Sequence, residues 1–261
     1  MIHPKARQAI KELVLNKIRS KLEEYAAETD YKPFFESIFS KEVVLKASLM
    51  QSIYTSFGMS IYEQMALILA ESAGYKTSRQ HKVLGTIDDE TRLHIAHICD
   101  QPIGTYTKAE EVALIRDMIQ PGKPEEDPDS TVDVYIKRQD GVEIYCDITS
   151  VKPNKKGTRA MRQKLLEWTA LRYSLDRNAK FETYIGIPYN PYHPEEYNRS
   201  FVVQNAHYPD EVLVQEALWA KFAGQDCFAE LIEIFDEVGM EMEMEIARLF
   251  GEKFKTTDDH R

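Results

Sequence analysis

Residues 132–149 carry two runs of alternating apolar and polar side chains separated by Gln-Asp-Gly, and this pattern predicts a β-hairpin. A three-residue loop that ends in glycine suits a hairpin whose glycine adopts the left-handed conformation. Such a loop pairs Arg138 with Val142, so counting back along both strands pairs Asp133 with Asp147. Two carboxylates then lie directly opposite each other, with Cβ atoms about 5 Å apart, where like charges destabilise a sheet. A bound divalent cation is the simplest compensation.

The composition limits the class of protein. A length of 261 residues fits one large domain or two small ones. The net charge of −10 argues against a globally basic surface for nucleic acid, although a local basic patch remains compatible with it. The 3 cysteines have no paired spacing, which fits a reducing compartment. Because the sequence has no secretory signal and no apolar run of membrane-spanning length, we expect a cytoplasmic protein that does not associate with membranes.

The pattern along the chain predicts an α/β fold. Predicted helices cover 5–28, 32–56, a segment from Ser60 to before Gly74 (with Gly58 as a break), 108–118, 158–175 and about 209–255. Besides the hairpin, strands are expected near 80–84 and at 181–187, and residues 120–131 and 188–194 are expected to form loops. The order strand, helix, strand over 142–187 predicts a crossover within a mixed sheet. We therefore expect a single domain over 1–261, in which helices flank a mixed β-sheet and residues 1–57 and 209–255 form helical extensions.

The two hairpin acids have a catalytic interpretation. An acid near the start of one strand, an acid on the next strand and a basic residue shortly afterwards form the PD-(D/E)xK nuclease pattern. Hydrolysis of a phosphodiester needs a cation, and Asp133 and Asp147 offer the oxygen ligands that suit Mg²⁺. A nearby lysine would orient the water and offset charge in the transition state. Acid pairs on hairpins are common, so a solvated sheet face explains the bare pattern equally well.

Five separated stretches resemble the TdeIII family of type II restriction endonucleases, in the order of that family. They are 57–64, Val132-Asp-Val with 147–154, 164–168, 188–192 followed by 197–199, and 216–219 followed by Gly224 and 228–239. The resemblance covers about residues 45–250. It implies a restriction-endonuclease-like fold, Mg²⁺ as cofactor, and cleavage of double-stranded DNA at a short palindrome of the GGNCC type.

The chain departs from that family at the second strand. The family pattern there is similar to Glu-x-Lys, whereas this chain has Asp147 and Thr149, so the catalytic ammonium is missing. Lys152 either fills the role from a shifted position, or the enzyme works without it, or the chain is impaired. We expect activity, with Thr149 lining the site. Glu63 matches a helix glutamate of the family and is either a third carboxylate near the metal or part of a capping box with Ser60.

DNA contacts are expected from two segments. The basic run after the hairpin would reach phosphates through Lys155, Lys156, Arg159 and Arg162, and the 188–199 segment offers Tyr189, Asn190 and Arg199. A solvated helix face and a proline-shaped loop are the alternative interpretations of these two segments. Two-fold cleavage of a palindrome implies a homodimer. A cognate methyltransferase would protect the host without being a stable partner. The rival hypothesis is a catalytically impaired or non-catalytic DNA-binding protein on the same fold.

Overall fold

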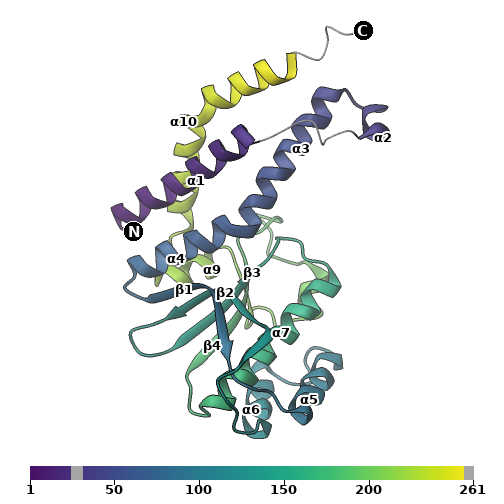
Figure 1. Ribbon diagram of the computed structural model, residues 1–261, viewed down its shortest axis with the longest axis vertical. Coiled ribbons are helices and arrows are strands. Elements are labelled where there is room, and N and C mark those ends of the chain that lie inside the picture. The colour runs from purple at the N-terminus through teal and green to yellow at the C-terminus, as the bar shows by residue number, and fades with distance from the viewer. Residues whose placement is uncertain (25–31, 256–261) are drawn as a thin grey trace. The chain divides into compact units, whose positions relative to one another are not determined.

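The computed structural model describes residues 1–24 and 32–255, and the chain divides into two compact units (Figure 1). One unit is Met1–Tyr62 with Ala229–Arg261, and the other is Glu63–Phe228. The N-terminal helical extension expected from the sequence falls in the first unit. Residues 209–228, which were expected to belong to a C-terminal extension, fall in the second unit. Among the described helices, none combines the length and apolarity needed to cross a membrane.

The first unit is helical. Its elements are α1 (Pro4–Glu24), α2 (Pro33–Glu36), α3 (Lys41–Ser56), the π-helical turn η2 (Phe57–Ile61) and α10 (Phe228–Lys255). A ladder of ion pairs joins α1 to α10, in which Arg7 contacts Glu237 at 2.5 Å and Arg19 contacts Glu245 at 2.8 Å. Contacts of this exposed kind contribute little stability each, so apolar packing has to supply most of it.

The sequence predicted that Gly58 breaks the helix, and this prediction was wrong. The chain passes from α3 through η2 into α4 (Tyr62–Ser72) while the backbone stays helical, because the extra residue is absorbed in a widened π turn. No helix begins at Ser60, so the capping box that we considered for Ser60 and Glu63 has no helix terminus to cap.

The second unit contains a five-stranded sheet in the order β1-β2-β3-β4-β5. The strands are β1 (Lys76–Leu84), β2 (Glu126–Lys137), β3 (Glu143–Ile148), β4 (Phe181–Ile187) and β5 (Val212–Val214). The first three strands are antiparallel, and β3, β4 and β5 are parallel. Besides α4, the helices are α5 (Asp89–Asp100), α6 (Lys108–Met118), α7 (Lys155–Leu175), α8 (Ser200–Val203) and α9 (Glu216–Ala223). The mixed sheet flanked by helices is therefore confirmed.

Two strand predictions were wrong at their edges. Residues 126–131, which include Pro128, were expected to belong to the 120–131 loop, yet they extend β2 and pair with β1. Pro128 is tolerated because β3 pairs only with Val134–Lys137, so this part of β2 has a free side that needs no donor. The short strand β5 lies in a segment that was expected to be wholly helical.

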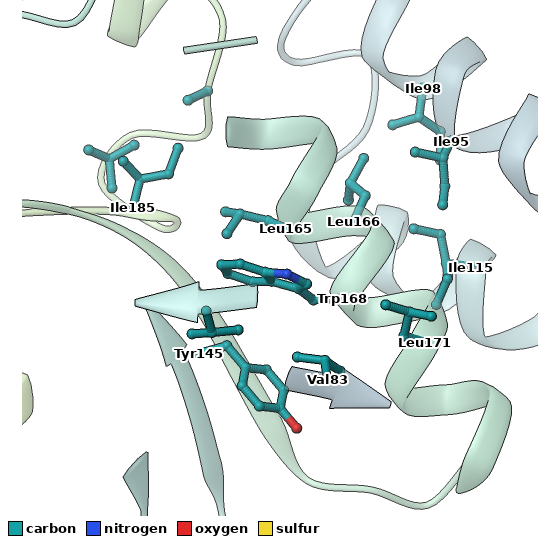
Figure 2. Packing of buried hydrophobic residues seen from close by; sticks show 14 of the residues in the cluster. Val83, Ile95, Ile98, Ile115, Tyr145, Leu165, Leu166, Trp168, Leu171 and Ile185 are labelled. Carbon is teal, nitrogen blue, oxygen red and sulfur yellow. The ribbon is translucent and has the colours of Figure 1, made fainter. Parts of the chain in front are cut away.

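Helix α7 is the central layer of the core (Figure 2). Trp168 and Leu165 pack towards Tyr145 and Ile185 of the sheet, and α5 and α6 cover the opposite side of α7 with side chains such as Ile95, Ile98 and Ile115. Trp168 is 0% exposed and Trp219 is 2% exposed, so both are core residues. A helix buried on both sides is held rigidly, so a polar side chain near its sheet-facing side is also held in place.

Candidate active site

The β2–β3 hairpin has the predicted register. Tyr135 pairs with Tyr145, the backbone N–H of Arg138 donates to the carbonyl of Val142 at 2.9 Å, and Gly141 has a φ of +86°. The regular pairing ends at Val134 and Cys146. The next position is the one at which Asp133 and Asp147 were expected to face each other.

At this position the two carboxylates replace the backbone pairing. The N–H of Asp133 donates to Oδ1 of Asp147 at 3.0 Å, and the N–H of Ile148 donates to Oδ2 of Asp133 at 3.1 Å. The remaining oxygens turn to other elements. Oδ1 of Asp133 accepts from Gln80 at 3.1 Å, and Oδ2 of Asp147 accepts from Lys164 at 2.5 Å. The two acids are thus brought together, and protein donors compensate part of the charge that we had assigned to a cation alone.

Asp147 is the more buried of the two acids. The pKa of its carboxyl is raised to about 6, because burial and the neighbouring charge of Asp133 raise it by more than the ammonium of Lys164 lowers it. A carboxylate that is costly to ionise in its own surroundings gains strongly from a nearby positive charge. The two acids therefore fit a hard cation such as Mg²⁺, since they offer partly buried carboxylate oxygens as ligands.

Lys164 follows Arg162 in the basic segment after the hairpin, and the sequence did not predict that it lies at the acids. It comes from the middle of α7, and its side chain is 27% exposed. Its ammonium lies 5.0 Å from the ring centroid of Trp168, one helical turn further on. That spacing is the signal that could have identified it, because a residue four positions before a core tryptophan lies on the same helix face.

A cavity of 350 Å³ opens beside Asp147 and Lys164. Its other lining residues are Ala160, Met161, Gln163 and Glu167, all from α7. The carboxylate and the ammonium therefore face the same space, and this space is large enough to admit a phosphate group.

Thr149 and Lys152, the other expected catalytic residues, have different surroundings in the structure. Thr149 is half-buried, and its N–H continues the strand by donating to the carbonyl of Gly186 at 2.9 Å. Lys152 is exposed and lies over the ring of Tyr192, 5.3 Å from its centroid, so the structure does not bring it to the carboxylates.

Glu63 is connected to the aspartates through Gln80. Its Oε2 accepts from Arg79 at 2.6 Å and from Nε2 of Gln80 at 3.3 Å, and the same Nε2 donates to Asp133. Gln80 has a φ of +50°, a strained conformation for a residue with a side chain. The conformation directs one amide group between two carboxylates, and this arrangement joins Glu63 to the pair of acids.

Part of the expected DNA-contacting set lies at one end of α7. Lys155, Lys156 and Arg159 are exposed in its first two turns. Arg199 reaches the same end, because its Nε donates to the carbonyl of Pro153 at 3.3 Å. Basic side chains from two distant segments therefore gather at the N-terminus of this helix.

Arg162 differs from this expectation. Its side chain is 4% exposed and forms an ion pair with Glu111, and its Nε lies 3.8 Å from Glu211. Nε2 of His207 lies 3.1 Å from the same Glu111 oxygen. Among the described residues, Glu111, His207 and Glu211 form a group with the spacing of metal ligands, but the guanidinium already supplies their positive charge. A buried and paired arginine is not available to a DNA phosphate, so we no longer count it among the contacts.

The loop after β4 is held by its own polar groups. The side-chain oxygen of Asn190 accepts from the N–H of Tyr192 at 2.9 Å, and its amide donates to the carbonyl of Glu195 at 2.8 Å. Tyr189 and Tyr192 pack partly against the core. The geometry gives these residues a role in shaping the loop, and their contact with DNA stays a prediction.

The chain is similar to known proteins along most of its length. The family model described as "Type II restriction endonuclease, HinfI" matches residues 2–239. The type II restriction enzyme HgiCII of Herpetosiphon aurantiacus is 24% identical over 243 residues, which cover 88% of this chain and 86% of that enzyme. HgiBI of the same organism is 22% identical over 231 residues, covering 84% of this chain and 81% of the relative. The type II restriction enzyme MjaII of Methanocaldococcus jannaschii is 25% identical over 195 residues, covering 70% of this chain and 52% of the relative. Since the family model spans well over half of the sequence, this chain belongs to the HinfI family of type II restriction endonucleases.

Proposed function

We propose that this protein is a Mg²⁺-dependent type II restriction endonuclease that cuts double-stranded DNA at a short palindromic site. The observation that carries the proposal is the pair Asp133 and Asp147 at the end of the hairpin, where Lys164 contacts Asp147 beside a cavity. Membership of a restriction endonuclease family supports the same class of substrate. Following the resemblance to the TdeIII family, we propose a site of the GGNCC type.

Asp133 and Asp147 are the proposed metal ligands. When bound, Mg²⁺ would polarise the scissile phosphate and make hydroxide available at neutral pH. The backbone donors at Asp133 and Ile148 hold the two carboxylates in place before any substrate arrives. Glu63 would act through Gln80, whose amide orients Asp133. Thr149 would line the site beside Asp147. The expected products carry 5′-phosphate ends.

DNA would be bound at the N-terminal end of α7. Lys155, Lys156, Arg159 and Arg199 supply positive charge there, and the positive end of the helix dipole adds to it. An acidic protein needs such a local patch to approach a polyanion. Lys152, which precedes this end of the helix, and Tyr189 and Asn190 of the loop after β4 remain proposed DNA neighbours.

A homodimer is proposed because cutting both strands of a palindrome needs two sites related by a two-fold axis. The helical unit offers a surface for it, since α2 and the chain beside it expose Phe34 at 84% and Ile38 at 74%. Exposed apolar side chains that lie close together mark interaction sites more often than isolated ones do. Sedimentation at micromolar concentration, with Ile38→Asp as the variant, tests the assembly. A cognate methyltransferase would protect host DNA without forming a stable complex.

A plasmid digest tests the function. Supercoiled DNA is incubated with the protein in Mg²⁺ and in EDTA, and the ends of any fragments are sequenced. We expect discrete fragments in Mg²⁺ only, with all ends at one short palindromic sequence. The rival hypothesis, a non-catalytic DNA-binding protein, is favoured by Thr149 at the place of the family lysine. Binding of duplex DNA in Ca²⁺ without cleavage in Mg²⁺ would support that rival.

A further inference from the structure

Strand β3 and the residues directly after it do not place at the acids the positively charged side chain that the proposed reaction needs. A transferring phosphate gathers negative charge, and a positioned ammonium is the usual means of offsetting it. Thr149 cannot supply an ammonium. Lys152 is exposed beside the ring of Tyr192, and its neighbours belong to the loop after β4. If the site is complete, the ammonium has to come from another helix or strand.

We infer that Lys164 of α7 is the catalytic lysine of this site and contacts the scissile phosphate or the attacking water. The inference rests on the proposed nuclease function and adds a residue to it. Nζ of Lys164 lies 2.5 Å from Oδ2 of Asp147, and both groups line the same 350 Å³ cavity. The ammonium is thus delivered from the helix that packs on the sheet instead of from the strand.

The orientation of Asp147 supports this role. Its Oδ1 is occupied by the N–H of Asp133, so Oδ2 is the oxygen that faces the cavity and Lys164. A cation bound at Oδ2 would compete with the ammonium for this oxygen. Lys164 would then turn its donors to the next acceptor in the cavity, and in the bound complex that acceptor is a phosphate oxygen or the water.

The side chain of Lys164 is held by two contacts, one with Asp147 and one with a core tryptophan. Its ammonium lies 5.0 Å from the ring centroid of Trp168, which is 0% exposed. A lysine side chain that is already held in one conformation loses little further rotamer freedom when it contacts the substrate. Lys164→Met is a suitable variant, because it removes the charge and leaves an unbranched apolar side chain of similar length beside Trp168.

The chemistry balances without a proton from the lysine. The water oxygen forms a bond to phosphorus, and the bond from phosphorus to O3′ breaks. One proton of the water stays with the hydroxyl of the new 5′-phosphate, and the other is delivered in net to O3′. Lys164 stays an ammonium throughout and donates hydrogen bonds to the developing negative charge.

The alternative is that the ion pair between Lys164 and Asp147 only stabilises the fold. On this alternative Lys164 neutralises Asp147, and removing it lowers stability and disturbs the carboxylates. The two explanations differ in what happens to metal affinity. Loss of a competing ammonium should leave Mn²⁺ binding at the aspartates as tight as in the wild type or tighter, whereas loss of a structural partner should weaken it.

The experiment compares Lys164→Met with Lys164→Arg, Lys152→Met and the matched exposed control Lys180→Met. For each variant it measures single-turnover cleavage in Mg²⁺, Mn²⁺ affinity by calorimetry without DNA, duplex affinity in Ca²⁺ and thermal melting. We expect Lys164→Met to slow cleavage by about 100-fold or more while duplex and Mn²⁺ binding are retained. Lys164→Arg should keep part of the rate.

A reciprocal variant guards against misfolding. Thr149 lies on the same strand face as Asp147, so a lysine there restores the family pattern. The double variant Lys164→Met, Thr149→Lys should cleave faster than Lys164→Met alone. Cleavage by Lys164→Met near the wild-type rate, a large loss in Lys152→Met instead, or weakened Mn²⁺ binding in a folded Lys164→Met would each overturn the inference. If wild-type protein does not cut in Mg²⁺, the proposed function fails, and the Mn²⁺ comparison still tests whether Lys164 competes for Asp147.

Discussion

The carboxylates of Asp133 and Asp147 each accept a hydrogen bond from the strand that carries the other. The N–H of Asp133 donates to Asp147 at 3.0 Å, and the N–H of Ile148 donates to Asp133 at 3.1 Å. The hairpin itself therefore holds the two acids together where its regular pairing stops. If the proposed function holds, this preorganisation places the metal ligands before substrate and metal arrive.

The first prediction concerns the buried Arg162. Replacing it by alanine leaves Glu111 and Glu211 buried without the guanidinium between them, and breaking a buried pair of this kind costs about 3–5 kcal/mol. Urea unfolding measures the loss. The control is Arg159→Ala, one turn earlier and exposed, which should change the free energy of unfolding by less than about 0.5 kcal/mol. Equal stability of both variants would show that the buried network is not a determinant of the fold.

The second prediction concerns the basic end of α7. Neutralising Lys155, Lys156 and Arg159 together should weaken binding to all duplexes alike, and the slope of log K against log salt should shrink by about 0.9 for each lost phosphate contact. Titrations in Ca²⁺ at several salt concentrations measure both quantities.

The chain offers a matched control for the basic end of α7. Arg116, Lys123 and Lys180 are equally exposed, and the N–H of Gly122 donates to the carbonyl of Ser174 near the opposite end of the helix. That end is about 30 Å away, because α7 has 21 residues. Neutralising these control residues should leave affinity and salt slope unchanged. The same effect from both triplets would mean that only net charge matters.

The third prediction concerns pH and Glu143. Burial raises the pKa of this carboxyl, but hydrogen bonds from Arg172 at 2.8 Å and Tyr145 at 2.6 Å outweigh burial, and the net shift is downwards. A lowered folded-state pKa stabilises the fold above the unfolded value of about 4.3 and loses this effect as the pH falls through the folded value. The destabilisation caused by Glu143→Gln should therefore be largest near neutral pH and shrink below about pH 4.

Urea unfolding at a series of pH values tests this. The exposed Glu196→Gln is the control, and it should show no comparable pH-dependent difference from the wild type. A Glu143→Gln effect that stays constant from neutral to acidic pH would contradict the assignment, because it would show a packing effect instead of a charge effect.

The parts of the fold that the sequence could predict are those governed by local rules. The hairpin register follows from alternation and from a glycine that has to take a positive φ, and Gly141 does so at +86°. Strand β4 and helix α6 follow in the same way from short-range pattern. Gly58 misled the prediction, because a π turn lets a helix continue through a residue that usually interrupts one.

The site was predictable only where it lies on one hairpin. Asp133 and Asp147 are coupled by register alone, whereas Lys164 reaches them through the packing of α7 on the sheet. Arg162, only two residues away, turns to the opposite side and is buried with Glu111. A run of basic letters does not show which members face the sheet, the core or solvent, because that depends on how the helix is rotated against its neighbours.

The central claim is that the two hairpin aspartates form a metal-dependent nuclease site. Asp133→Asn and Asp147→Asn each retain an oxygen that can accept the cross-strand hydrogen bond but lose a charged metal ligand. The measurement is single-turnover cleavage of the mapped DNA site in Mg²⁺, with duplex binding in Ca²⁺ and thermal melting as controls for folding. The account predicts that either variant still folds and binds DNA but cuts it about 100-fold more slowly or worse. Near wild-type cleavage by either variant would contradict the account, because the site would then lie elsewhere in the protein.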